Sequence, residues 1–260
     1  MDRPRIGIIG GTGVYDLPNL RFEDDITENT AYGEVPLRRG TYEASTGDSV
    51  DVIFMARHGS DHSVPPHRVN YRANVTALRS AGVHRVVATA AVGSLRADLL
   101  PGTLVLLDQF LDFTRGRITT FFDEVGEVRH TDMTEPYHGE TRRLLLRAAG
   151  KAGVRLEARG TYVCTEGPRF ETAAEVRAYG SLGGDIVGMT NVPEVVLARE
   201  IGLAYAAVAL VTNLGAGISA NPLTHEEVLE AMEANRLQLA ELLGAFLEEV
   251  STGEFGEETP

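Results

Sequence analysis

Short apolar runs rich in β-branched residues alternate along the chain with segments in which apolar residues recur every three or four positions. The runs predict buried strands, and the spaced segments predict helices. Because the runs show no strict alternation of apolar and polar residues, we expect strands covered on both faces, in a largely parallel α/β sheet. The predicted strands are residues 5–9, 50–55, 84–92, 103–108, 160–165, 185–189 and 205–212.

Helical spacing is clearest near the end of the chain. Helices are predicted at residues 68–82 and 140–153, and residues 223–250 form the longest such segment. Thr224 and Glu227 match a capping box at its start. One apolar face then continues to its end through Val228, Met232, Leu239, Leu242, Leu243, Phe246 and Val250. We therefore expect one long helix packed on the core.

His225 stands in the first turn of this predicted helix. The positive end of the helix dipole disfavours a protonated imidazole there, and a neutral imidazole can exchange hydrogen bonds with a hydroxyl group. An exposed histidine without a function is the alternative that the pattern leaves open.

Composition limits the class of protein. The chain has 260 residues, of which 43% are hydrophobic, and a formal net charge of −13. This length fits one large α/β domain or two small ones. The basic residues are scattered, which argues against a nucleic-acid or anionic-membrane surface. No stretch reaches the ~20 apolar residues of a membrane span, and no signal peptide is predicted.

Cys164 is the single cysteine and lies in the apolar run at residues 160–165. One cysteine excludes an internal disulfide framework and suits a reducing cytoplasm. We expect a buried thiol rather than a nucleophile, and a cytoplasmic protein.

A glycine-rich turn follows the first predicted strand, with Gly10, Gly11, Thr12 and Gly13. A dinucleotide fingerprint needs a third spaced glycine and an acidic residue at a later strand end, and a Walker loop needs Lys-Ser or Lys-Thr. The third glycine is missing, and residues 23–33 do not have the pattern of a strand that ends in an acidic residue. No Lys-Ser or Lys-Thr follows the turn either, so both motifs are absent. What remains is a turn whose N–H groups can bind an anion, with Thr12 as a further donor. A tight strand exit is the alternative.

Arg57 and His58 come just after the predicted strand at residues 50–55. Functional groups often stand there in α/β sheets, and a guanidinium offers phosphate a fork of donors to which His58 adds another. His58, His62 and His67 suggest a metal site as the alternative. Zinc ligands usually form tight pairs, and prolines interrupt this segment, so we expect no metal and solvated His62 and His67 side chains.

Three later segments carry further candidates. Phe170 and Glu171 lie in a Gly-Pro turn before a helix, and Met189 and Thr190 stand between a strand and a helix. Thr190 could face an anion at that helix N-terminus. Asn213 follows a strand, and its amide can donate and accept hydrogen bonds at once. Each also has a structural alternative: Phe170 as a core residue, and Glu171 and Asn213 as caps.

In combination, these segments resemble the trimeric purine nucleoside phosphorylase and methylthioadenosine phosphorylase family. The motifs occur in the family's order, from Ile6 to about Val250: "IGIIGGTG", "ARHG", "VNYRAN", "ATAAVGSLR", "EGPRFET", "GMTNVPEVVLARE" and "LVTN". The resemblance implies a single α/β domain with a central mixed, partly barrel-like sheet flanked by helices, here residues 1–250. The acidic residues 251–260 are expected to form a disordered tail.

The resemblance also implies a reaction and roles for individual residues. In phosphorolysis, inorganic phosphate attacks the anomeric carbon of a purine nucleoside and releases the base, without a cofactor or metal. The implied phosphate-binding set is Thr12, Arg57, His58 and Thr190, with the backbone near Ala90 and Ala91. Many relatives have Thr or Asn at the position of Ala90, so one side-chain contact near the phosphate is missing here.

The nucleoside contacts are implied in the same way. Met189 would lie against the ribose hydroxyls and Phe170 against the base. Asn213 would hydrogen-bond N7 while its NH2 group addresses the 6-substituent, so that Asn213 and His58 act in catalysis. His130 stands where the family supplies a residue to the neighbouring subunit's ribose pocket, which implies a functional homotrimer or a dimer of trimers.

Three positions bear on base specificity. The adenine-cleaving branch usually has Asp where this chain has Asn213 and Gly215, and a small hydroxyl residue where it has Glu171. The residues here are those of the 6-oxopurine branch. The chemistry agrees, because a carboxylate accepts from N1–H of hypoxanthine or guanine but would face the N1 lone pair of adenine.

His225 bears on the 5′ end of the sugar. This position is usually apolar in the methylthio-specific branch and His in the branch that takes a 5′-hydroxyl. We therefore expect inosine and guanosine as substrates. The alternatives are an S-methyl-5′-thioinosine or 5′-methylthioadenosine phosphorylase, and a non-catalytic purine-binding protein on the same scaffold.

Overall fold

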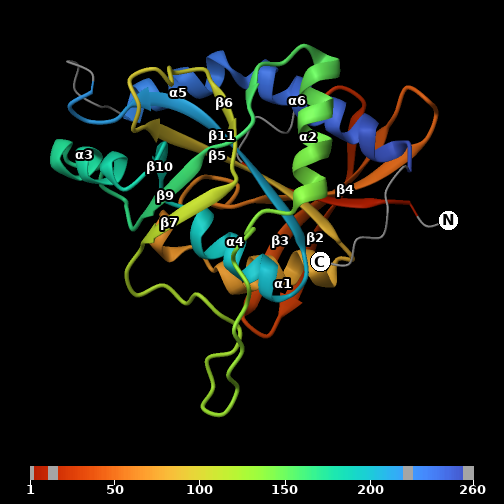
Figure 1. Ribbon diagram of the computed structural model, residues 1–260. Helices are drawn as coiled ribbons and strands as arrows, with labels where there is room; N and C mark the ends of the chain where they lie inside the picture. Colours follow the sequence, from red (N-terminus) through yellow and green to blue (C-terminus); the bar gives the residue numbers. More distant parts are fainter. Residues whose placement is uncertain (1–2, 11–16, 219–224, 254–260) are drawn as a thin grey trace.

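The fold is described from a computed structural model of the chain (Figure 1). The structure describes residues 3–10, 17–218 and 225–253, with the backbone alone at residues 225, 227 and 228. Thr12, the expected cap Thr224 and residues 254–260 of the expected tail lie outside the described residues. The side chain of His225 lies outside them as well.

A mixed sheet runs through the middle of the described fold, as Figure 1 shows. Its path is β2-β3-β4-β1-β5-β10-β9-β7, and β11 leads from β5 to β6 and β8. The strands are β1 Arg5–Gly10, β2 Leu20–Thr30, β3 Gly33–Glu43, β4 Ser49–Ala56, β5 Arg85–Ser94, β6 Leu104–Leu106, β7 Gln109–Phe113, β8 Leu156–Glu157, β9 Thr161–Thr165, β10 Ile186–Gly188 and β11 Ala204–Leu214. Every strand predicted from the apolar runs is present.

The strand directions explain where polar strand ends gather. β4, β1, β5 and β11 form parallel pairs, so their carboxyl ends lie at one edge of the sheet. β10 runs antiparallel to β5, and β6 runs antiparallel to β11. Parallel pairing also joins β10 to β9, β9 to β7 and β6 to β8, so most of the described pairs are parallel, as expected, while the sheet as a whole is mixed.

One edge of β5 changes partners along its length. It pairs with β1 as far as Ala88 and with β10 only from Gly93. Because β11 occupies the other edge from Arg85 to Ser94, residues 89–92 form an opening between β1 and β10. This opening becomes one wall of the candidate site.

Helices cover both faces of the sheet (Figure 1). α1 Tyr71–Ser80 packs beside α4 Asn191–Glu200, and α2 Gly139–Ala152 packs beside α6 Arg236–Ser251. The two pairs belong to separate apolar cores, with Ile9 in the first and Ile8 in the second. Neighbours along a strand point to opposite faces, so the expected double coverage of the sheet is confirmed.

The long helix expected at residues 223–250 is wrong as a single element. Within the described residues it is two helices, α5 His225–Ala234 and α6, separated at Asn235. The Asn235 side chain donates from Nδ2 to the Ala231 carbonyl at 2.8 Å, and such local bonds compete with helix geometry. The apolar face is nevertheless buried at Leu239, Leu242, Leu243, Phe246 and Val250.

The pattern analysis missed the first hairpin, β2 and β3. Residues 23–30, which did not read as a strand, are paired with β3 almost throughout. β2 is an edge strand with no buried residue, so its sequence carries few apolar residues. Exposed ion pairs join it to β3, including Asp25–Arg38 at 3.0 Å and Asp24–Arg39.

Two further expectations concern the core and the membrane. Cys164 is fully buried, and its thiol donates to the Val192 carbonyl at 3.4 Å. Burial raises the pKa of this thiol to about 12, which confirms the expectation of an unreactive buried group. In the part of the chain that the structure describes, no helix has the length and apolar character that crossing a bilayer requires.

Candidate active site

A cavity of about 290 Å³ opens at the carboxyl ends of the central strands. Ligands bind at this edge in open α/β sheets. Residues of β1, β5 and β11 and those that follow β4 and β10 line it. Since β10 enters antiparallel, Met189 and Thr190 come back over the opening in β5 rather than leading away from it.

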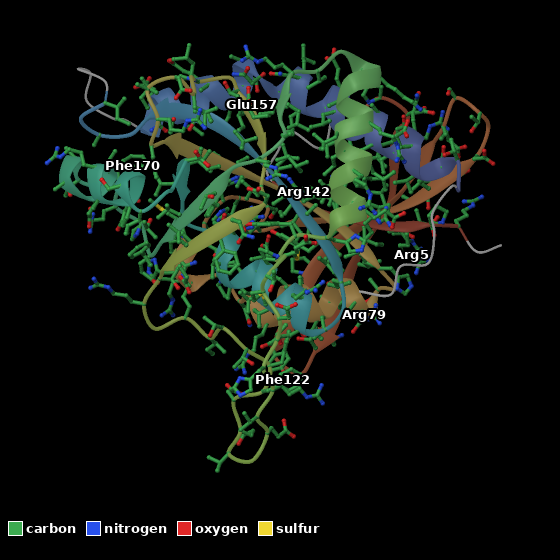
Figure 2. All side chains as sticks on the ribbon, in the orientation of Figure 1. Arg5, Arg79, Phe122, Arg142, Glu157 and Phe170 are labelled. Atoms are coloured by element: carbon green, nitrogen blue, oxygen red, sulfur yellow. The ribbon has the colours of Figure 1, made fainter. Side chains whose placement is uncertain are left out.

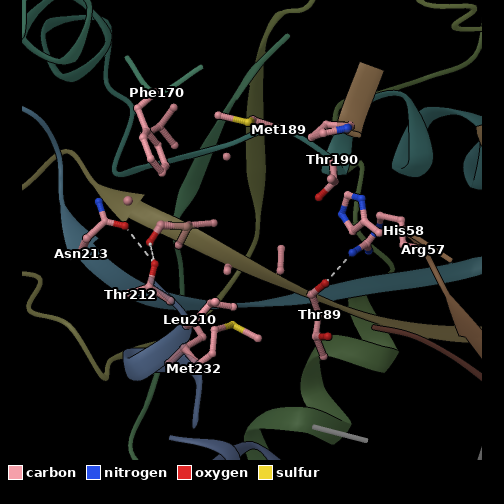
Figure 3. Close-up of a pocket in the computed structure, with 18 of the residues that line it drawn as sticks. Arg57, His58, Thr89, Phe170, Met189, Thr190, Leu210, Thr212, Asn213 and Met232 are labelled. Carbon is pink, nitrogen blue, oxygen red and sulfur yellow. Dashed lines mark hydrogen bonds between the residues drawn. The ribbon is translucent and has the colours of Figure 1, made fainter. Parts of the chain in front are cut away.

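Figure 3 shows that the cavity has two chemically different ends. Arg57, His58 and Thr190 lie together at one end, and Phe170, Thr212 and Asn213 lie at the other, with Met189 between them. The lining residues predicted from the sequence are Arg57, His58, Ala90, Ala91, Phe170, Glu171, Met189, Thr190, Asn213 and Gly215. The structure thus brings together candidates that are up to 158 positions apart, from 57 to 215.

Arg57 is buried, and its guanidinium is held on three sides. Nε and Nη2 donate to the two carboxylate oxygens of Glu194, each at 2.8 Å, and Nη1 donates to the Thr89 carbonyl at 2.8 Å. Burial alone would lower the pKa of Arg57, but the Glu194 carboxylate outweighs burial and holds this pKa above its ordinary value. Arg57 therefore stays a cation in a fixed orientation.

His58 presents a hydrogen-bond acceptor to the cavity. Its Nδ1 lies 2.8 Å from the Val64 carbonyl, and a carbonyl only accepts, so Nδ1 carries the proton. Burial, supported by the Arg57 charge, lowers the pKa of His58. The neutral ring then has a lone pair on Nε2. This differs from the donor role expected from the sequence: Nε2 would accept from a protonated phosphate oxygen.

Thr190 closes the same end of the cavity. It is the N-cap residue of α4, but its side chain makes no capping bond. Its backbone N–H donates to the buried Tyr162 hydroxyl at 3.2 Å, which fixes the turn after β10. The hydroxyl of Thr190 lies beside His58 in Figure 3. Ala90 and Ala91, in the stretch of β5 that is paired on one edge only, complete the wall.

Glu171 gives the other end an acceptor. The Thr165 hydroxyl donates to its Oε1 at 2.7 Å. Burial raises the pKa of Glu171, and the hydrogen bond from Thr165 opposes this increase. Phe170 beside it is 38% exposed, which overturns the alternative of a core residue. The arrangement suits a carboxylate that waits, partly desolvated, for a donor from a ligand.

Asn213 gives this end an amide. β11 shifts register between Val211 and Asn213, and this irregularity turns both Thr212 and Asn213 toward the cavity (Figure 3). The Thr212 hydroxyl donates to Asn213 Oδ1 at 2.9 Å, and Asn213 Nδ2 donates to the Leu214 carbonyl at 3.1 Å. One N–H of the amide and the second lone pair of Oδ1 are left for a ligand.

Gly215 lines the cavity, and packing at this position leaves no room for a side chain. A Cβ on it would lie 2.9 Å from the Ser94 carbonyl oxygen and 3.1 Å from Val176 Cγ1. Its own N–H donates to the same Ser94 carbonyl at 2.7 Å. The end of β11 is therefore pressed against the end of β5 where the two strands border the cavity.

Arg117 is a buried residue near the site that the sequence analysis missed. Its side chain is 3% exposed. Nη1 donates to the carbonyls of Met189 and Val192 at 2.9 and 2.7 Å, and Nη2 donates to the Glu166 carbonyl at 2.8 Å. Arg117 thus joins the turns after β9 and β10. Nothing in the surrounding sequence marked it, because most of its partners are backbone carbonyls distant along the chain; its ion pair with the Glu166 carboxylate, at 3.4 Å, is longer.

Two candidates from the sequence are not placed in the cavity. His130 is exposed in the segment 114–138 between β7 and α2, which projects from the body of the molecule in Figure 1. Figure 2 marks this projection by Phe122. His225 begins α5, and the contacts of its side chain lie outside the described residues.

The loop histidines differ from one another. His62 is exposed, as expected, but it also lines the cavity, and its ring lies 6.0 Å from that of His58. His67 is exposed and is not a lining residue. Among residues 3–10, 17–218 and 225–253, no group of three or more His, Cys, Asp or Glu side chains could hold a metal ion.

The family model described as the phosphorylase superfamily matches residues 5–248, nearly the whole chain. The chain belongs to the phosphorylase superfamily. Within it, the chain is 53% identical to a probable 6-oxopurine nucleoside phosphorylase of Dictyoglomus turgidum, over 95% of this chain and 92% of that protein. It is 46% identical to a probable S-methyl-5′-thioinosine phosphorylase of Thermodesulfovibrio yellowstonii, over 88% and 84%.

A solved superfamily structure has the same fold. Methylthioadenosine phosphorylase from Schistosoma mansoni in complex with adenine matches with a TM-score of 0.88 and 34% identity, over 96% of this chain and 93% of that one. The resemblance inferred from the motifs is thereby confirmed, as is the mixed α/β fold class. The chain is a nucleoside phosphorylase by family.

The contact at Gly215 yields a stability prediction. Gly215→Ala should lower the free energy of unfolding by about 1–3 kcal/mol, because the Ser94 carbonyl has to move. The matched control is Gly244→Ala in α6, where a Cβ meets nothing within 4 Å. That change should raise the free energy of unfolding by up to about 1 kcal/mol, through helix propensity. Urea unfolding measures both, and equal effects would contradict the packing argument.

Proposed function

We propose that this phosphorylase cleaves 6-oxopurine ribonucleosides, such as inosine and guanosine, into the free base and ribose-1-phosphate. The observation that carries the proposal is a single cavity with Arg57, His58 and Thr190 at one end and Phe170 and Asn213 at the other (Figure 3). Glu171, next to Phe170 in the chain, lines the same cavity. The name of the Dictyoglomus turgidum relative supports the same substrate class. Inorganic phosphate is the co-substrate, and we propose no cofactor or metal.

At the phosphate end, the nucleophile is held and not chemically activated. Arg57 and the Thr190 hydroxyl donate to phosphate oxygens, and His58 Nε2 accepts from the protonated one. The backbone of Ala90 and Ala91 borders the same space, and an N–H group on the edge of β5 that β11 does not occupy is a further donor. A phosphate fixed beside the anomeric carbon is already positioned for attack, which lowers the activation barrier. Its negative charge stabilises the oxocarbenium character of the transition state.

At the base end, the departing purine gains negative charge. The Glu171 carboxylate accepts from N1–H, and the free N–H of Asn213 donates to O6, so that the developing charge is stabilised in a partly desolvated pocket. Asn213 Oδ1 is an acceptor and can bind N7 only once N7 carries a proton. Met189 lies against the ribose and Phe170 against the base. Adenine has a lone pair at N1 and an amino group at C6. Its N1 and the Glu171 carboxylate are both acceptors, so no hydrogen bond can form between them.

S-methyl-5′-thioinosine is the second candidate substrate. One part of the cavity wall is apolar, from Leu210 on β11 and from Met232 and Leu229 on α5. Such a wall suits a methylthio group at the 5′ carbon, and the Thermodesulfovibrio yellowstonii relative bears that name. His225 at the start of α5 favours a 5′-hydroxyl instead. The base-reading residues serve either substrate.

The substrate proposal is tested with inosine, guanosine, adenosine and S-methyl-5′-thioinosine, each with and without phosphate. Phosphate-dependent release of hypoxanthine from inosine is expected, with kcat/KM for adenosine lower by about 10⁴. Glu171→Ala should lower kcat/KM for inosine and shrink that ratio. Adenosine turnover within tenfold of inosine would refute the base assignment. A preference for the methylthio substrate would select the second candidate.

The ionisation of Glu171 gives a pH prediction. Its pKa is raised in the folded protein, so kcat/KM for inosine should fall on acidification at a higher pH than an ordinary carboxyl group would cause. Thr165→Val removes the hydroxyl that stabilises the ionised form. The acid limb should then move to still higher pH. A pH profile at saturating phosphate measures both proteins, and an unmoved limb in Thr165→Val would count against a role for the Glu171 carboxylate.

We also propose that the working form is a homotrimer, alone or paired into a hexamer, in the cytoplasm. The projecting segment 114–138 carries exposed Ile118, Val125 and Val128 and the exposed His130, which suits an arm that reaches a second copy. The single cysteine, kept as a buried thiol, suits a reducing compartment.

A subunit-mixing experiment tests the role of His130. His130→Ala and Glu171→Ala homo-oligomers should each be impaired, because each lacks one part of every site. Oligomers assembled from both proteins should regain activity, since some sites combine Glu171 from one subunit with His130 from another. Light scattering gives the mass of the assembly. Failure of the mixture to exceed either parent would place His130 outside the neighbour's site.

A further inference from the structure

A buried chain of polar side chains lies behind the phosphate end of the cavity. The Glu194 carboxylate accepts from Arg57 through both of its oxygens at 2.8 Å. The Tyr205 hydroxyl donates to Glu194 Oε1 at 2.6 Å and accepts from Asn191 Nδ2 at 3.1 Å. The Tyr137 hydroxyl donates to Asn191 Oδ1. The chain leads from the guanidinium into the core between α4 and β11.

Glu194 itself does not reach the cavity. Its side chain is 0% exposed, and it is not one of the lining residues. Stability alone is a weak reason for such a pair, because removing two charges from water costs about as much as their attraction returns, and apolar residues of similar volume would serve. The effect of Glu194 on Arg57 is a stronger reason.

The pair determines which donors of Arg57 face the cavity. A guanidinium has five N–H donors in one plane. Glu194 takes the donor on Nε and one on Nη2, and the Thr89 carbonyl takes one on Nη1. The second donor of Nη1 and that of Nη2 are left over from these contacts. Since Arg57 lines the cavity, they are the donors that an anion can use.

We propose that Glu194 is the positioning residue of the phosphate site: it holds the Arg57 guanidinium in the orientation that offers two N–H donors to phosphate. The hydrogen bond from the Tyr205 hydroxyl in turn fixes the Glu194 carboxylate on the side away from the cavity. The proposal rests on the proposed function, since it takes inorganic phosphate as the ligand. It also has an electrostatic consequence. Glu194 compensates the charge of Arg57, so phosphate is bound by the direction of donors more than by net charge.

Glu194→Gln is the direct test, because it keeps shape and removes the second acceptor. The amide has one carbonyl oxygen, and its NH2 group would face an N–H of Arg57, so the two-point hold is lost. Phosphate affinity, measured by calorimetry on the free full-length protein, should fall about tenfold or more. The KM for phosphate should rise in parallel, while the KM for inosine changes by less than about twofold.

Two further variants grade the effect. Tyr205→Phe removes only the hydroxyl behind Glu194 and should weaken phosphate binding in the same direction by a smaller factor. If Glu194→Gln does not fold, Tyr205→Phe alone tests the proposal. Glu194→Asp keeps the carboxylate and should restore part of the phosphate affinity that Glu194→Gln loses.

Glu140→Gln is the matched control for loss of stability. Glu140 on α2 pairs with Arg85 at 2.8 Å, and both side chains are largely buried. Arg85 begins β5, whereas the cavity is lined by the other half of that strand. Glu140→Gln should lower the melting temperature and leave phosphate affinity unchanged.

The results separate the two proposals. Phosphate affinity that survives Glu194→Gln, with a fall in melting temperature like that of Glu140→Gln, would reduce Glu194 to a structural residue and overturn the inference. An equal loss of affinity for phosphate and inosine would overturn it as well. If the unaltered protein binds phosphate but releases no hypoxanthine from inosine, the proposed function fails, and the calorimetry still decides the role of Glu194.

Discussion

The site depends on a stretch of strand β5 that has a partner strand on one edge only. Buried backbone N–H and C=O groups need partners, and residues 89–92 of β5 face neither β1 nor β10. Arg57 donates to the Thr89 carbonyl, and the other backbone N–H and C=O groups on this edge border the cavity. The antiparallel entry of β10 creates the opening and, in the same turn of chain, returns Met189 and Thr190 over it. Sheet topology and ligand site are thus one feature.

The two ends of the cavity differ in the kind of hydrogen bond they offer. Arg57 and Thr190 supply donors, which suits an oxyanion, whereas the Glu171 carboxylate supplies an acceptor, which suits a base with N1–H. The chain as a whole is strongly acidic, at −13. A cation that serves an anionic ligand in such a protein works best when it is buried and fixed, and Arg57 is both.

The sequence predicted those parts of the fold and site that are encoded locally. Buried strands appear as apolar runs, and polar residues directly after them, such as Arg57 and Thr190, mark the active edge of the sheet. The hairpin β2–β3 escaped detection because an exposed edge strand needs no apolar run. The break at Asn235 escaped because the apolar spacing continues across it, from Met232 to Leu239.

The supporting residues escaped for a different reason. Glu194 lies 137 positions from Arg57, and Arg117 bonds to carbonyls that carry no sequence signal. Thr212 was not predicted as a site residue, because threonine is common in strands and a single one in an apolar run carries no functional signal. Partners of this kind become visible only when the chain is folded, whereas the groups that they hold are visible beforehand.

The crowding around Gly215 constrains how this pocket can diverge. A carboxylate at that position, which the resemblance gives to the adenine-cleaving branch of the family, would be introduced at a cost in stability, because the first carbon of any side chain meets the Ser94 carbonyl and Val176. A lineage that exchanges oxidised for aminated purines would reduce that cost by making room on helix α3, Ala173–Ser181, where Val176 is buried. Base preference in this protein is therefore tied to the packing of a helix that does not itself line the cavity.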